Sequence, residues 1–155
     1  MQLKIEYMQP FVESALQTLE RVSGEPVTVG PPSLVGAIFP GASVNVAAKI
    51  GGALYGDLIC SMSSSTARSL AETVAGGPVQ GFGETLRGAL VVLAEEWSDQ
   101  ARLLLADTGM VCEVGEPVVF QGLNVEMATT QPALTAPIET SVGQVNISVA
   151  VRNGR

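Results

Sequence analysis

Three acidic side chains lie close together in a segment that the sequence predicts to be a long helix, residues 84–105. Glu95, Glu96 and Asp99 share one side of this helix, because residues three or four positions apart lie on the same face. A carboxylate can accept a proton from water, so this face could carry acid–base chemistry. Alternatively, it is an ordinary solvated face, partly paired with Arg102.

Val92 lies on the same outer face, where a solvated helix would normally be polar. With Leu103 nearby on that side, it could mark a contact with another protein. The opposite face is apolar at steps of three and four residues, with the single tryptophan in its middle. This inner stripe consists of Leu86, Leu90, Leu93, Trp97, Ala101 and Leu104. We therefore expect the helix to line the core.

The composition is that of one folded domain over residues 1–155. Hydrophobic residues make up 46% of the 155 residues and charged residues only 15%, so dense packing is expected and disorder is not. The chain contains no histidine. Its absence excludes Ser-His-Asp and Cys-His catalysis and removes the commonest metal ligand. Cys60 and Cys112 lack CxxC spacing and are expected to be buried in strands, so no metal site is predicted.

The net charge of −7 argues against nucleic acid or an anionic membrane as a partner. The first ten residues contain no apolar signal segment, and no apolar run is long enough to cross a membrane. We therefore expect a cytoplasmic protein.

Two further helices and several strands must position the long helix. An apolar stripe predicts a first helix over residues 3–22, which either starts near Gln9 or is kinked at Pro10. A serine run offers an N-cap for a second helix that ends at Ala75, before Gly76. Strands are predicted over residues 43–50 and 53–62, joined as a hairpin by a turn at Gly51–Gly52.

Four more strand candidates follow the long helix. Gly115 and Pro117 interrupt the first of them, so it should be bulged or lie at a sheet edge. The last alternates apolar and polar residues most clearly. These candidates cover residues 110–121, 123–129, 133–140 and 144–152. Because helices and strands are segregated along the chain, the pattern favours an α+β fold with a largely antiparallel sheet.

Short motifs along almost the whole chain resemble the CheX family of chemotaxis phosphatases, whose relatives are CheC and FliY. The matching stretches are Tyr7-Met8-Gln9-Pro10-Phe11-Val12-Glu13-Ser14, Gly56-Asp57-Leu58-Ile59, Leu93-Ala94, Gly115-Glu116-Pro117-Val118-Val119 and Pro137-Ile138-Glu139-Thr140. The resemblance implies a CheC-like fold with long helices packed on the sheet. It also implies a CheY-type response regulator as partner and a homodimer joined through its sheets. The alternating strand over residues 144–152 would be a suitable edge for this pairing. Any Mg²⁺ would belong to the regulator, and no cofactor of this chain is expected.

The resemblance also shows a departure at the motif itself. The active helix of the family carries a Glu-x-x-Asn pair, followed farther along by a proline. In this sequence those places hold Val92, Glu95 and Pro117, with Gly88 one turn earlier. The proline is kept, whereas the glutamate and the asparagine are not. Phosphatase activity is therefore in doubt, and Gly88, Val92 and Pro117 become candidate partner-binding residues.

Three hypotheses follow from this departure. In the first, the protein binds a response regulator but has lost or weakened the phosphatase chemistry. In the second, it is an active phosphatase that uses a displaced acid: Glu95, or the pair Glu96 and Asp99 with Gln100 beside it. Glu95, Glu96 and Asp99 are accordingly the candidate catalytic residues. In the third, it is a non-catalytic dimeric scaffold whose contact surface includes Val92.

Overall fold

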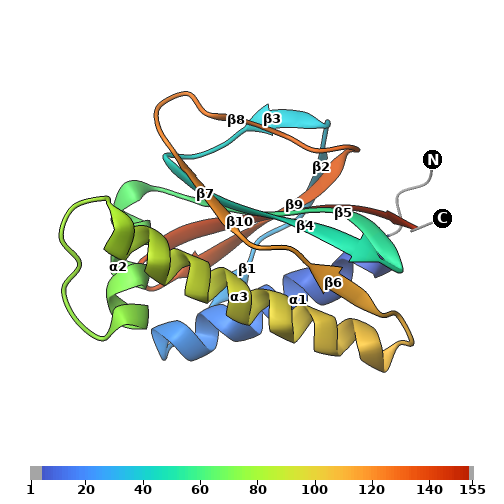
Figure 1. The fold of residues 1–155 in the computed structure, drawn as a ribbon, viewed down its shortest axis with the longest axis horizontal. Helices are drawn as coiled ribbons and strands as arrows, with labels where there is room; N and C mark the ends of the chain where they lie inside the picture. The colour runs from blue at the N-terminus through green and yellow to red at the C-terminus, as the bar shows by residue number, and fades with distance from the viewer. Residues whose placement is uncertain (1–4, 154–155) are drawn as a thin grey trace.

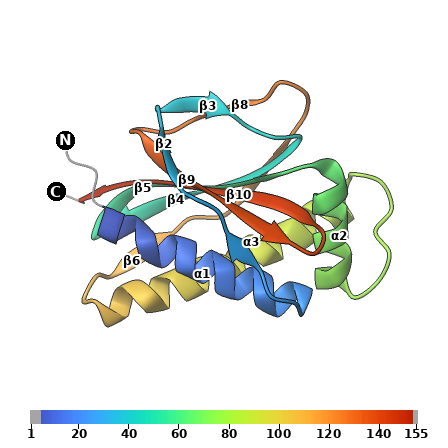
Figure 2. The ribbon, with the colours of Figure 1, turned by 180° about the vertical axis from the view of Figure 1, so that it is seen from behind.

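A computed structural model describes residues 5–153. These residues form a large antiparallel sheet whose two faces are covered by different elements. Helices α1 (Ile5–Ser23), α2 (Ser64–Ala75) and α3 (Glu84–Asp107) pack on one face. A two-stranded arm arches over the other face, as Figure 1 and the reverse view in Figure 2 show. The α+β class with a largely antiparallel sheet is confirmed.

The three predicted helices are present. The first begins at Ile5 and continues through Pro10 as one helix, so the alternative start near Gln9 was wrong. Leu3 and Lys4 of the prediction lie outside the described residues. Ser63 caps α2, because its side-chain oxygen accepts a hydrogen bond from the Thr66 amide. Gly76 ends α2 in the left-handed conformation that glycine favours.

The large sheet has the strand order β1-β9-β10-β5-β4-β6, with β2 also pairing with β9 and β7 also pairing with β4. Its pairs are antiparallel. The strands are β1 (Thr28–Val29), β2 (Ser33–Val35), β4 (Val44–Gly52), β5 (Leu54–Met62), β6 (Cys112–Val114), β7 (Val118–Gln121), β9 (Ala133–Thr140) and β10 (Gly143–Asn153). β1 and β2 are too short for a periodic pattern in the sequence to indicate them as strands.

Two details of the predicted sheet were wrong. The predicted hairpin is present as β4 and β5, but Gly51 and Gly52 are not a separate two-residue turn, because both belong to β4 and pair with β6. The last strand, β10, was expected to be a suitable edge for dimer pairing, but it lies between β5 and β9 and is paired on both sides over residues 145–149. Its middle residues are buried, since the helices cover one face of the sheet and the arm covers the other.

The arm consists of β3 (Ile38–Pro40) paired with β8 (Glu126–Ala128). The predicted strand over residues 123–129 is thus shorter than expected and belongs to a separate two-stranded sheet. Phe39 and Met127 point from the arm into a small apolar cluster with Ile59 of the large sheet. This second core explains why the arm has a defined position over the sheet.

The main core lies between the helices and the sheet, as the apolar stripe of α3 predicts. Trp97 is buried there, and its indole Nε1 donates a hydrogen bond to the Phe11 carbonyl of α1 at 2.8 Å. This bond satisfies the one polar atom of the indole inside the core. Leu105 is buried at the end of the stripe, whereas Leu104 is only partly buried.

Within the described residues, no helix has the length and apolar character needed to cross a membrane. The same part of the chain contains no group of three or more His, Cys, Asp or Glu side chains placed to hold a metal ion.

Candidate functional site

A β-bulge opens a groove beside α3. Between the β6 and β7 pairings, residues 115–117 lie opposite only Ala48 and Lys49 of β4, so the edge strand carries one extra residue. Such an insertion bends the strand locally. The bulge predicted from Gly115 and Pro117 is confirmed. Pro117 is buried in it, where its lack of an N–H removes no ladder hydrogen bond.

The α3 groove is the open space between α3 and this bulge, with a volume of about 400 Å³. Its lining residues are Glu95, Ser98, Asp99, Arg102, Val114, Gly115, Glu116 and Pro117. Two candidate catalytic residues, Glu95 and Asp99, therefore share a groove with the candidate partner-binding residue Pro117. The acids and the proline lie far apart in the sequence and meet because β6 and β7 run back along α3.

The charges of the α3 groove are mostly negative. Asp99 Oδ1 pairs with Arg102 Nη2 at 2.7 Å, which leaves Glu95 and Glu116 without an ion pair among the described residues. An unpaired carboxylate attracts a basic group and repels a bare phosphate. Among the described residues that line the groove there is no asparagine or glutamine, so it offers no side-chain amide to hold a water.

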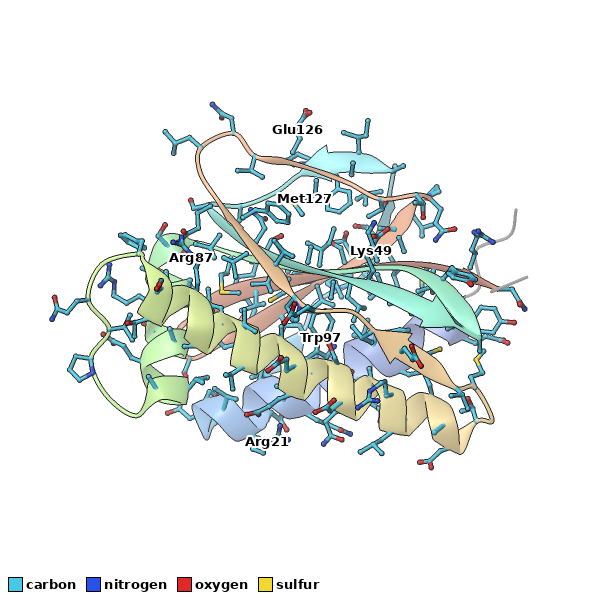
Figure 3. All side chains as sticks on the ribbon, in the orientation of Figure 1. Arg21, Lys49, Arg87, Trp97, Glu126 and Met127 are labelled. Atoms are coloured by element: carbon cyan, nitrogen blue, oxygen red, sulfur yellow. The ribbon has the colours of Figure 1, made fainter. Side chains whose placement is uncertain are left out.

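Glu96 points away from the groove. Its Oε1 accepts a hydrogen bond from Arg21 Nη2 of α1 at 2.8 Å. Figure 3 shows Arg21 on the side of α3 that faces α1, opposite the edge strands. Glu96 and Asp99, the displaced acid pair of the second hypothesis, thus have different cationic partners and different surroundings.

Val92 and Gly88 lie on the outer face of α3 toward its N-terminal half. Val92 is 42% exposed, as expected for a contact residue on a helix surface. Gly88 is exposed too, and a Cβ at this position would meet nothing within 4 Å. The predicted outer face of the helix is confirmed: Val92, Glu95 and Asp99 are all exposed.

Two features of this region were missed in the sequence. Glu116 lines the groove, although only its neighbours Gly115 and Pro117 had been singled out. Arg87 of α3 donates a hydrogen bond from Nη1 to Gln121 Oε1 of β7 at 3.0 Å, near the N-terminal end of α3 in Figure 3. The sequence does contain a signal for Glu116, because it is a charged residue in a predicted strand that also contains glycine and proline. The pairing of Arg87 with Gln121 had no sequence signal, because it depends on tertiary packing.

The cysteines are buried, as predicted, and they are separate free thiols. Burial raises the pKa of the Cys60 thiol to about 12. The thiolate form that a nucleophile needs is therefore suppressed near neutral pH.

Comparison with solved structures gives the fold. The chain superposes on the chemotaxis protein CheX from Desulfovibrio desulfuricans with a TM-score of 0.85, at 20% identity over 95% of this chain and 99% of that one. A CheC-like superfamily protein from Shewanella sp. PV-4 gives a TM-score of 0.84, at 19% identity over 97% and 100% of the two chains. A structure of a CheX–CheY–BeF₃–Mg²⁺ complex from Borrelia burgdorferi matches with a TM-score of 0.77, at 20% identity over 97% and 100%.

No family model matches the sequence, and no curated protein matches it. The fold of this protein is nevertheless that of the CheX and CheC-like chemotaxis proteins, over nearly the full length of both chains. The fold implied by the sequence resemblance is confirmed.

Proposed function

We propose that the protein is a CheX-like signalling protein that binds a phosphorylated CheY-type response regulator but has little or no phosphatase activity of its own. The observation that carries the proposal is the mismatch between scaffold and motif. The fold is shared with CheX proteins, one of them solved with CheY, whereas the motif places on α3 hold Val92 and Glu95. The binding surface would include Gly88, Val92 and the bulge at Pro117.

The chemistry explains why these residues would make a poor phosphatase. An aspartyl-phosphate is hydrolysed by in-line attack of water, and the transition state needs positioning more than a strong base. A neutral amide suits this role because it can both donate to and accept from the water. Glu95 would bring a negative charge to a phosphoryl group that is already negative, which costs on the order of several kcal/mol at an intermediate dielectric. Val92 can neither hold water nor pair with a basic residue of the regulator.

The test is loss of phosphoryl label from a CheY-type regulator, with Mg²⁺ supplied for the regulator. We expect wild-type protein to leave the rate of label loss unchanged and the Val92→Glu/Glu95→Asn protein to raise it. The two single variants are the matched controls, since neither restores the complete pair. Binding is measured separately, by calorimetry against the BeF₃-activated regulator. Absence of binding by wild type would contradict the proposed partner, whatever the label assay gives.

A fast wild-type reaction would favour the active-phosphatase alternative, which the presence of Glu95 and Asp99 beside Pro117 in the α3 groove supports. In that case Glu95→Ala should abolish turnover. Glu96→Ala should do so only if Glu96 leaves its pair with Arg21. Retained turnover in both variants would remove these residues from the mechanism.

The exposed Val92 also supports the scaffold alternative, in which this face contacts a partner outside response-regulator signalling. We further propose that the protein forms a homodimer, that neither nucleic acid nor a membrane is a partner, and that it acts in the cytoplasm, where it would meet a response regulator. The chain's own contribution requires no metal or other cofactor in this proposal.

A further inference from the structure

A second pocket lies on the opposite face of the sheet from the helices, under the arm. This arm pocket has a volume of about 300 Å³, near the lower end of the range for small-molecule sites. Its wall is formed by residues of β4, β5, β7 and the arm, together with Glu116 of the bulge. Because the arm is held to the sheet by its own apolar cluster around Phe39 and Met127, the pocket is formed before any ligand arrives.

Most of the pocket wall is apolar. Ala47 and Ile59 are paired across β4 and β5 and form its floor, while Val118 and Phe120 project from β7 on the same side. Met127 reaches down from the arm, as Figure 3 shows. A ligand with an aliphatic body would therefore bury apolar surface here, and the exposed ring of Phe120 could also face a cation.

One end of the pocket is charged. Lys49 and Asp57 are directly opposite each other on β4 and β5, and Lys49 Nζ lies 2.7 Å from Asp57 Oδ1. Asp57 is buried, with 7% of its side chain exposed, and Oδ2 accepts a hydrogen bond from the Thr130 amide at 3.3 Å. Glu116 lies on the bulge beside Lys49, because the Gly115 amide donates to the Lys49 carbonyl.

These three groups have one positive and two negative charges, and Glu116 has no ion-pair partner in the described part of the chain. The cluster thus lacks one positive charge. Glu126 also lines the pocket, but its side chain points away from the sheet in Figure 3 and so away from this cluster. We propose that the arm pocket binds a small primary alkylamine, with its ammonium group between Glu116 and Asp57 and its aliphatic chain against Ile59, Val118 and Phe120.

The probe is hexylamine, which is a cation at neutral pH, and the controls of equal chain length are hexanoate and hexanol. Binding to the full-length protein is measured by NMR shift changes and by calorimetry at low salt. We expect saturable binding of hexylamine and at least tenfold weaker binding of the other two. Absent binding of hexylamine, or equal binding of all three, would overturn the proposal.

Three variants locate the binding. Glu116→Gln should weaken hexylamine about fivefold, the upper end of what one exposed ion pair provides. Glu126→Gln is the matched control, because it removes the same charge from a side chain that points away from the sheet in Figure 3. Ala47→Leu should abolish binding by filling the floor. Equal effects of the two Glu→Gln changes, or unaltered binding to Ala47→Leu, would show non-specific attraction to an acidic protein and overturn the proposal.

Lys49→Met gives an independent measurement. It leaves the buried Asp57 without its cation, so the melting temperature should fall, and hexylamine should raise the melting temperature of this variant more than that of wild type. Hexanoate should not. A variant stabilised equally by both compounds, or by neither, would contradict the placement of the ammonium beside Asp57.

Discussion

Single residues on α3 differ in their partners more than in their chemical type. Glu95, Glu96 and Asp99 are all carboxylates on neighbouring turns, yet Glu96 is paired with Arg21 and Asp99 with Arg102. Both pairs are substantially exposed, so each should contribute at most about 1 kcal/mol to stability. Their importance is that, among the described residues, Glu95 is left as the carboxylate without an ion pair on the α3 side of the groove.

The hydrogen bond of the Trp97 indole is a single-residue contact that should contribute to the stability of the fold. Trp97→Phe removes the donor to the Phe11 carbonyl and reduces the volume of a buried side chain. We expect the free energy of unfolding to fall by about 2–3 kcal/mol, from the lost bond and the residual cavity. Urea unfolding followed by circular dichroism measures the change. A loss below about 0.5 kcal/mol would mean that the core repacks around phenylalanine.

Cys60 should make stability depend on alkaline pH. Its thiol pKa is raised by burial from 9.0 to about 12, so the folded state keeps a proton that the unfolded state loses above pH 9. The stabilisation is complete below pH 9 and is lost as the pH rises toward 12. The free energy of unfolding should therefore fall by up to about 1.4 kcal/mol per pH unit in this window.

Urea unfolding at a series of pH values on both sides of pH 9 tests this dependence. The Cys60→Ala protein is the control, because it differs from wild type only by the loss of this thiol. Its free energy of unfolding should fall less steeply with pH than that of wild type. Parallel pH profiles for the two proteins would contradict the argument.

At the scale of elements, the edge formed by β6 and β7 determines where the groove lies. The bulge at residues 115–117 shifts the register by one residue between the two strands. It also places Glu116 in the lining of both the α3 groove and the arm pocket. A regular strand in this position would direct residue 116 to only one face of the sheet.

Two glycines of these elements should respond oppositely to alanine. Gly52 has φ of +103°, and a Cβ there would lie 2.7 Å from the Val111 carbonyl oxygen. Gly52→Ala should therefore cost about 1–3 kcal/mol. Gly88 lies in the exposed surface of α3 with open space around it, so Gly88→Ala should stabilise the protein by about 0.5–1 kcal/mol through helix propensity. Thermal and urea unfolding of the two variants measure the sign of each change in stability. Changes of the same sign would contradict the different roles given to Gly52 and Gly88.

At the scale of the whole molecule, the arrangement of the sheet restricts how two copies could join. The interior position of β10 removes it as an interface, which leaves the outer strands β1 and β2 on one side and β6 and β7 on the other. The surface of α3 around Val92 is a further possibility, since this residue is exposed.

Light scattering after size-exclusion chromatography should give twice the mass of the chain if the homodimer forms. Val92→Asp distinguishes the interfaces, because a buried, unpaired carboxylate would weaken a dimer joined through α3 and leave a dimer joined through the sheet intact. A single-chain mass across the concentration range would contradict the homodimer.

The sequence alone determined the helices, most strands and the fold class, because these depend on local periodicity and capping. Trp97 in the apolar stripe of α3, Ser63 at the start of α2 and the interruption at Gly115 and Pro117 all carried such local signals. The exposed outer face of α3 followed from the same periodicity.

Tertiary structure decided which of these residues meet. Local periodicity does not indicate which distant segments pair with each other. Such pairing determines the interior place of β10, the separate arm formed by β3 and β8, and the short strands β1 and β2. Glu96 and Asp99 differ for the same reason. Helical periodicity predicts that they share one side of α3, but only the packing of α3 against α1 brings Arg21 to Glu96. The arm pocket was likewise invisible, because its walls come from β4, β5, β7 and β8 and exist only once the arm folds over the sheet.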